Sequence, residues 1–194
     1  KFDALVSVTS SGWALEDLSD AMRADVDVVF AAIAQDASSV EFAADSLKAD
    51  RGVMRAAIQA DPWKLEHASE ELRGDATFVL EALVLNGFVL MHASEALRAD
   101  KRCVLAAVRK NGQSLEHASE ALKADPDVVV AAARQDIWSL PLAAAELRAD
   151  PAVCAAILSG VRGKYGPSVP TATLGGNISG LVNEQDLVLT TVQQ

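Results

Sequence analysis

The only histidines of this chain, His67, His92 and His117, follow one another at a constant spacing. Imidazole is a common metal ligand, so they are candidate ligands of a metal ion or a pigment. One ion needs its ligand atoms within about 2.1 Å. Equivalent atoms in successive repeated units lie about 10 Å apart, because that is the spacing of packed helices. We therefore expect a half-buried polar ladder with no metal site and no bound cofactor. Axial ligation of a partner's pigment by one histidine stays open.

Acidic side chains precede basic ones by three residues at five places. The acidic members are Asp20, Asp45, Glu70, Glu95 and Glu120, and the basic members are Arg23, Lys48, Arg73, Arg98 and Lys123. Pairs at i and i+3 share one helix face and contribute only a few tenths of a kcal/mol each. The pattern is typical of a solvated face, and an electrostatic groove for a peptide is the alternative.

Motifs for covalent or phosphoryl chemistry are missing from the sequence. There is no Gly-x-Ser-x-Gly and no phosphate-binding loop. The two cysteines, Cys103 and Cys154, fall at apolar positions of the repeat described next and are expected to be buried thiols. We expect no catalytic residues and no enzyme, with a non-catalytic segment of a larger enzyme as an alternative.

A 25-residue repeat positions all of these residues. An aspartate recurs at every 25th residue, at Asp25, Asp50, Asp75, Asp100, Asp125 and Asp150. Within a unit, Leu115, Ala118 and Leu122 follow the i, i+3, i+7 spacing of one helix of about three turns. Asp125 followed by Pro126 predicts the start of a second helix, since Asp caps helices and Pro suits the first helical position.

These signals predict an all-α fold, specifically an α-solenoid of tandem 25-residue helical hairpins with an irregular C-terminal tail. The helical-repeat domain is expected at residues 1–159, with a partial unit at 1–11. Complete units start at 12, 37, 62, 87, 112 and 137. Residues 160–194 are rich in Gly and Pro and are expected to form an extended arm that binds a partner.

The unit from Gly112 to Asp125, reading GQSLEHASEALKAD and followed by Val128 and Val129, resembles a known family. This is a tandem helical repeat classified only as a domain of unknown function and abundant in algae and other protists, dinoflagellates among them. The resemblance covers roughly residues 12–159. It implies a helical repeat and brings no catalytic residues. It also suggests a narrower hypothesis: a peripheral accessory subunit of a plastid photosynthetic membrane complex, such as a photosystem.

Charge and hydropathy limit the partners. The chain has 194 residues and a net charge of −10, which argues against nucleic acid as the main partner. No apolar run reaches the roughly 20 residues that a transmembrane helix needs. We therefore expect other proteins as partners, within a multi-subunit complex, with peripheral association to a membrane complex as one option. The compartment is left unknown, and thylakoid association is one option.

Partner-binding candidates are the large apolar side chains at positions where the units differ. At the third junction, where the unit that starts at 62 meets the unit that starts at 87, the chain is apolar at positions where other units carry polar or small residues. These residues form an exposed patch in one interpretation, and a tighter turn that buries them in the other. The complete set of candidates is Val84, Leu85, Phe88, Val89, Met91, Trp13, Trp63, Trp138, Tyr165, Leu187, Val188 and Leu189. Together they predict a non-catalytic scaffold that mediates protein–protein interaction within a larger assembly.

Overall fold

The computed structural model describes residues 1–165, and the side chains of residues 1–159. Its elements recur once in each unit as a 3-10 helix, a short α-helix and a longer α-helix. The 3-10 helices are η1 (Gly12–Leu15), η2 (Ala37–Phe42), η3 (Pro62–His67), η4 (Gly87–His92), η5 (Gly112–His117) and η6 (Ile137–Leu142). The short helices are α2 (Asp20–Arg23), α4 (Asp45–Lys48), α6 (Glu70–Gly74), α8 (Glu95–Arg98), α10 (Glu120–Lys123) and α12 (Ala145–Arg148).

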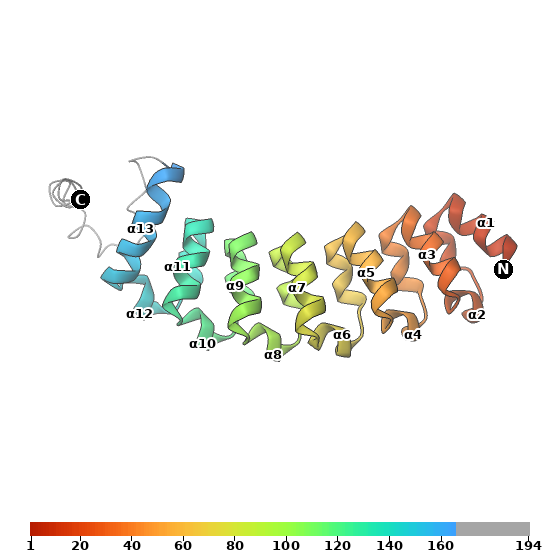
Figure 1. The fold of residues 1–194 in the computed structure, drawn as a ribbon, viewed down its shortest axis with the longest axis horizontal. Helices are drawn as coiled ribbons and strands as arrows, with labels where there is room; N and C mark the ends of the chain where they lie inside the picture. The colour runs from red at the N-terminus through yellow and green to blue at the C-terminus, as the bar shows by residue number, and fades with distance from the viewer. Residues whose placement is uncertain (166–194) are drawn as a thin grey trace.

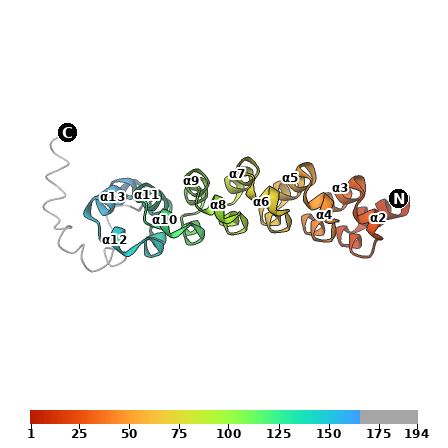
Figure 2. The same cartoon turned by 90° about the horizontal axis from the view of Figure 1, so that it is seen from below.

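The longer helices form one layer and the 3-10 helices form the other. The longer set is α1 (Phe2–Ser10), α3 (Val26–Gln35), α5 (Arg51–Ala60), α7 (Ala76–Leu85), α9 (Lys101–Lys110), α11 (Pro126–Gln135) and α13 (Pro151–Tyr165). Each longer helix packs against the next, and each 3-10 helix packs against the next. Figure 1 shows this row running from the N-terminus to α13, and Figure 2 shows the two layers from below. The all-α expectation is confirmed, and the chain is an elongated stack of repeated units.

The prediction that each unit begins with one continuous helix is wrong. In the unit that starts at Gly112, the helix is interrupted near its middle, because the backbone of Ala118 is extended, with φ −72° and ψ 156°. The backbone N–H of Ser119 then donates to the carbonyl of Arg98 in the preceding unit, at 2.9 Å. The same bond joins Ala44 to Arg23, Ser69 to Lys48, Ser94 to Arg73 and Ala144 to Lys123. A hydrogen bond between units replaces one within the helix, so periodicity alone did not reveal the break.

Aspartate caps start the longer helices as predicted. The Asp125 carboxylate accepts hydrogen bonds from the backbone N–H groups of Asp127 and Val128, and Pro126 follows at the first helical position. A second cap follows four of the longer helices, at Asp36, Asp61, Asn86 and Asp136. Asn86 Oδ1, for example, accepts from the N–H of Phe88 at 3.0 Å. Because each cap satisfies N–H groups that no helical carbonyl reaches, short helices persist in this chain.

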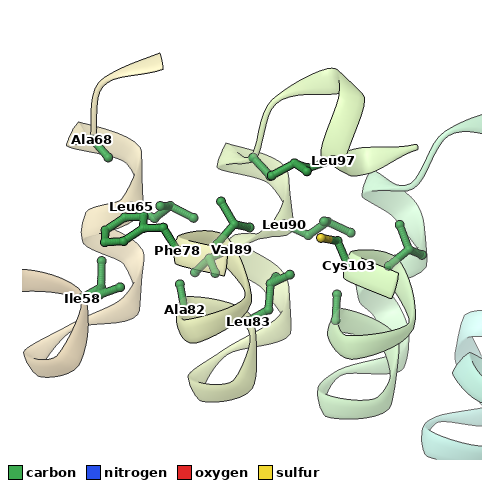
Figure 3. Packing of buried hydrophobic residues seen from close by; sticks show 14 of the residues in the cluster. Ile58, Leu65, Ala68, Phe78, Ala82, Leu83, Val89, Leu90, Leu97 and Cys103 are labelled. Carbon is green, nitrogen blue, oxygen red and sulfur yellow. The ribbon is translucent and has the colours of Figure 1, made fainter. Parts of the chain in front are cut away.

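The apolar core is continuous along the whole stack. Its most regular members stand ten residues before each cap aspartate and are 2% exposed or less: Leu15, Val40, Leu65, Leu90, Leu115 and Leu140. Figure 3 shows Leu90 with Phe78, Leu83 and Val89 where η4 meets α7. Burying one such side chain stabilises the fold by about 1.5–3 kcal/mol. No unit buries its apolar faces alone, so stability comes from stacking.

Glycine sets the distance between neighbouring units. A Cβ on Gly87 would lie 2.2 Å from the carbonyl oxygen of Ala107 in the next unit, and one on Gly112 would lie 2.6 Å from that of Ala132. The longer helices pack more closely at these junctions than between α5 and α7, where Pro62 occupies the corresponding position. The junction between α5 and α7 is therefore the loosest of the described part of the chain.

Ion pairs connect neighbouring longer helices at every second junction, between α1 and α3, α5 and α7, and α9 and α11. Lys1 contacts Asp25 at 2.8 Å, and Lys101 contacts Asp125 and Asp127, both at 2.8 Å. Arg51 makes the corresponding ion pair with Asp75. The residues at the same position in the intervening units are Val26, Ala76 and Pro126, which carry no charge. These ion pairs therefore recur at every second unit from Lys1 to Lys101, and the series ends at Pro151.

Helix α1 carries polar residues at two positions that later units bury, and it also exposes Phe2 and Val6. Asp3 and Ser7 are exposed, at positions where later units bury apolar residues such as Val28 and Ala32.

Candidate functional site

The predicted partner-binding residues at the third junction divide between exposed and buried positions. Val84 is 65% exposed, and Leu85 and Met91 are each 44% exposed. Phe88 is half-buried. Val84 and Leu85 end α7 in one layer, whereas Phe88 and Met91 belong to η4 in the other. The single patch predicted from the sequence is therefore divided between the longer-helix layer and the 3-10 layer.

The prediction that Val89 binds a partner is wrong, because its side chain is fully buried. Its position in the repeat faces the core, and the serines that occupy it elsewhere, Ser39, Ser114 and Ser139, are fully buried too. Serine is common on surfaces, so its presence at this position misled the sequence interpretation. Val89 supplies apolar packing where two of those serines, Ser39 and Ser114, leave a buried hydroxyl without a hydrogen bond.

The tryptophans lie along the 3-10 layer, and two of them, Trp13 and Trp63, pack on the next unit. The Trp13 ring meets Phe42 edge-on at a centroid distance of 5.4 Å, and Trp63 meets His92 edge-on at 6.0 Å. Trp13 also donates from Nε1 to Asp36 at 2.7 Å. Part of this aromatic row is thus structural, as geometry of this kind stabilises pairs by about 0.5–1.5 kcal/mol.

Trp138 is the most exposed of the three tryptophans, at 62%. The residue at the spacing of Phe42 from Trp13 and of His92 from Trp63 is Pro167, which lies outside the described residues. Tyr165 ends α13, but its side chain is not described. Leu187, Val188 and Leu189 lie outside the described residues, so their part in partner binding stays a prediction.

A shallow hollow accompanies the exposed end of α7. It has a volume of about 510 Å³ and lies between α5 and α7, the loosest junction. Ile58, Val84 and Leu85 form its apolar lining. The Arg55 guanidinium pairs with Glu81 at its edge, and that pairing lowers the pKa of Glu81. The hollow can receive an apolar side chain but presents no convergent catalytic groups.

The histidines form a ladder on the 3-10 layer, and partial burial lowers the pKa of each. Within residues 1–159, no group of three or more His, Cys, Asp or Glu side chains is placed to hold a metal ion. The expected absence of a metal site stays a prediction. Both cysteines are buried as expected, and burial raises the pKa of Cys103 to about 11. No helix among the described residues is long and apolar enough to cross a bilayer.

The histidine ladder predicts a stability change in mild acid. The histidine pKa is lower in the folded chain than the ordinary 6.5, so the unfolded chain binds more protons as the pH falls below 6.5. We expect the midpoint of thermal unfolding to fall between pH 7 and pH 5.5. A variant with His67, His92 and His117 all replaced by Gln should show a flatter curve over that interval. An identical slope in both proteins would contradict the prediction.

Sequence reasoning missed the basic surface of α9. Arg102, Arg109 and Lys110 are exposed on this helix. The net charge of the whole chain concealed them, because the acidic residues elsewhere outweigh them. Charge counted helix by helix would have found them.

Comparison with known families supports the repeat. The family described as Domain of unknown function (DUF4116) matches residues 50–98, 75–123 and 100–148, so the chain belongs to this family. Each match spans two successive units and begins one unit after the previous match. The 25-residue step between matches agrees with the length of one structural unit. No curated protein and no solved structure matches the chain.

Proposed function

We propose that this chain is a non-catalytic scaffold that binds partner proteins through the exposed apolar end of α7. The observation that carries the proposal is the exposure of Val84 and Leu85, where the next unit places Arg109 and Lys110. Contiguous exposed apolar side chains on a protein surface usually mark an interface. Met91 and the exposed tryptophans add apolar surface on the other layer.

The elongated stack suits this role. Each unit contacts only its neighbours, so side chains at the same position in successive units form rows along the surface. Binding specificity then comes from the units that depart from the consensus, and the third junction departs most. The narrower hypothesis of an accessory subunit of a plastid photosynthetic complex depends only on where the family occurs, and it stays a prediction, as does the segment of a larger enzyme.

Native fractionation of cells that make the protein tests the proposal. We expect the chain to migrate in a complex, and a Val84→Ser/Leu85→Ser variant to migrate as a monomer with unchanged helix content. A matched control is Val6→Ser/Val26→Ser, since both valines are exposed, at 51% and 43%, on the longer-helix layer. This control should stay in the complex. Monomeric migration of the wild-type chain would contradict the scaffold role, and retention of the Val84→Ser/Leu85→Ser variant in the complex would contradict binding through the end of α7.

A further inference from the structure

Helix α9 is strongly basic within an acidic chain. Its ten residues include Lys101, Arg102, Arg109 and Lys110 and no acidic residue. The chain as a whole carries −10. Such a concentration of one charge on a single helix requires a reason in the fold or in binding.

The fold explains only part of that charge. Lys101 closes the junction to α11 through Asp125 and Asp127. Arg109 and Lys110 lie in the last turn, where the helix dipole favours cations. Arg102 lies in the first turn, where the dipole disfavours a cation. Within residues 1–159, the Arg102, Arg109 and Lys110 side chains make no ion pair or hydrogen bond.

Two of these cations, Arg109 and Lys110, lie beside the apolar end of α7. Val84 and Arg109 occupy the same position in successive units, on helices that pack together (Figure 1). The axes of packed helices lie about 8–10 Å apart. Arg102 and Arg109 are separated by seven positions, so they share a helix face and lie about 10 Å apart along the axis. The longer-helix layer thus offers a hollow between α5 and α7, apolar at Ile58, Val84 and Leu85, and a row of unpaired cations on α9 across α7 from it.

We propose that α7 and α9 together bind an acidic amphipathic segment of a partner protein. An apolar side chain of that segment enters the hollow lined by Ile58, Val84 and Leu85, and its carboxylates lie over Arg102, Arg109 and Lys110. The inference rests on the proposed scaffold function and specifies the chemistry of the partner. Charge complementarity of this kind sets specificity and the association rate.

The surrounding charges favour a narrow segment over a broad anionic surface. On one side α7 presents Glu81, paired with Arg55. On the other α11 presents Asp127, paired with Lys101, and Arg134, which donates to the Ala156 carbonyl. Among α7, α9 and α11, all within the described residues, the unpaired cations are therefore confined to α9. A membrane or a nucleic acid would bring phosphates over these carboxylates and over a chain of net charge −10. A single acidic segment lying along α9 avoids that repulsion.

Peptide titration of the full chain tests the proposal by fluorescence anisotropy. The probe is a labelled helical peptide of about 15 residues with leucines on one face and glutamates beside them. Its counterpart has lysine in place of every glutamate. We expect the acidic peptide to bind at least about tenfold more tightly than the basic one. In an Arg109→Glu/Lys110→Glu variant this preference should be lost or reversed, and Val84→Ser/Leu85→Ser should weaken binding of the acidic peptide about tenfold.

The control variant makes the same change in net charge elsewhere. Arg23 and Arg148 end the short helices α2 and α12, on the part of the surface that we call the short-helix edge. The Arg23→Glu/Arg148→Glu variant should keep its preference for the acidic peptide. Equal loss in both charge variants would mean a general field effect and would overturn the proposal. So would equal or undetectable binding of the two peptides, or tighter binding to phosphatidylserine vesicles that Arg109→Glu/Lys110→Glu abolishes. Each of these results leaves comigration in the native complex, and hence the scaffold role, to be judged separately.

Discussion

A Val89→Asp variant is expected to lose its cooperative fold around the third junction. Val89 is fully buried among Phe78, Leu83 and Leu90 (Figure 3), so the carboxylate would enter the core without a partner. An unpaired buried charge costs about 3–5 kcal/mol or more, a large share of the stability of a typical domain. Circular dichroism during thermal or urea unfolding measures the loss.

Two controls separate burial from charge. Leu85→Asp places the same carboxylate on a side chain that is 44% exposed, and should change the free energy of unfolding by less than about 1 kcal/mol. Val89→Ser should cost about 1–2 kcal/mol, because three other units bury serine at this position. If Val89→Asp unfolded with the same midpoint as Leu85→Asp, the assignment of Val89 to the core would be wrong.

Gly87→Ala is expected to destabilise the chain by about 3 kcal/mol through a clash between units. The new methyl group would lie 2.2 Å from the Ala107 carbonyl oxygen, which is backbone and cannot rotate away. Separation of η4 from α9 would also lengthen the hydrogen bond from the Gly87 N–H to Asn111 Oδ1, now 2.9 Å. Urea unfolding should show a lower midpoint.

Gly74→Ala is the matched control for that clash. A Cβ there would meet only Ser94 Oγ, at 3.9 Å, which is ordinary contact. Alanine is also the better helix former, so Gly74→Ala should be neutral or stabilise by up to about 1 kcal/mol. Equal destabilisation by both substitutions would show that glycine does not set the spacing between units.

Much of the fold could be predicted from the sequence because one constraint acts at every unit. The apolar row that includes Leu115 and the cap aspartates recur in register, and the two cysteines fall at two neighbouring apolar positions of the unit, so each unit supports the interpretation of the others. The break at Ala118 could not be predicted from periodicity, because it depends on a backbone hydrogen bond to Arg98 in another unit. The two-unit spacing of Lys1, Arg51 and Lys101 was visible in the sequence but is concealed when only positions shared by all units are compared.

The candidate site was predicted less completely than the fold. Exposure of Val84, Leu85 and Met91 agrees with the patch hypothesis, while Val89 does not, because residue type alone cannot distinguish a buried serine position from an exposed one. The cations of α9 become relevant only when α9 is known to pack beside α7. The hollow depends on the looser packing of α5 and α7, a distance that no motif encodes.

Zero-length cross-linking of the native assembly tests the central claim most directly. A carbodiimide joins amines to carboxylates in direct contact, and mass spectrometry locates each linked pair. The account predicts links from Lys110 of α9 to aspartates or glutamates of a partner protein, with few from Lys48 or Lys123 on the short-helix edge. Partner links confined to that edge, or an assembly in which Lys110 reacts only with carboxylates of its own chain, would contradict binding through α7 and α9.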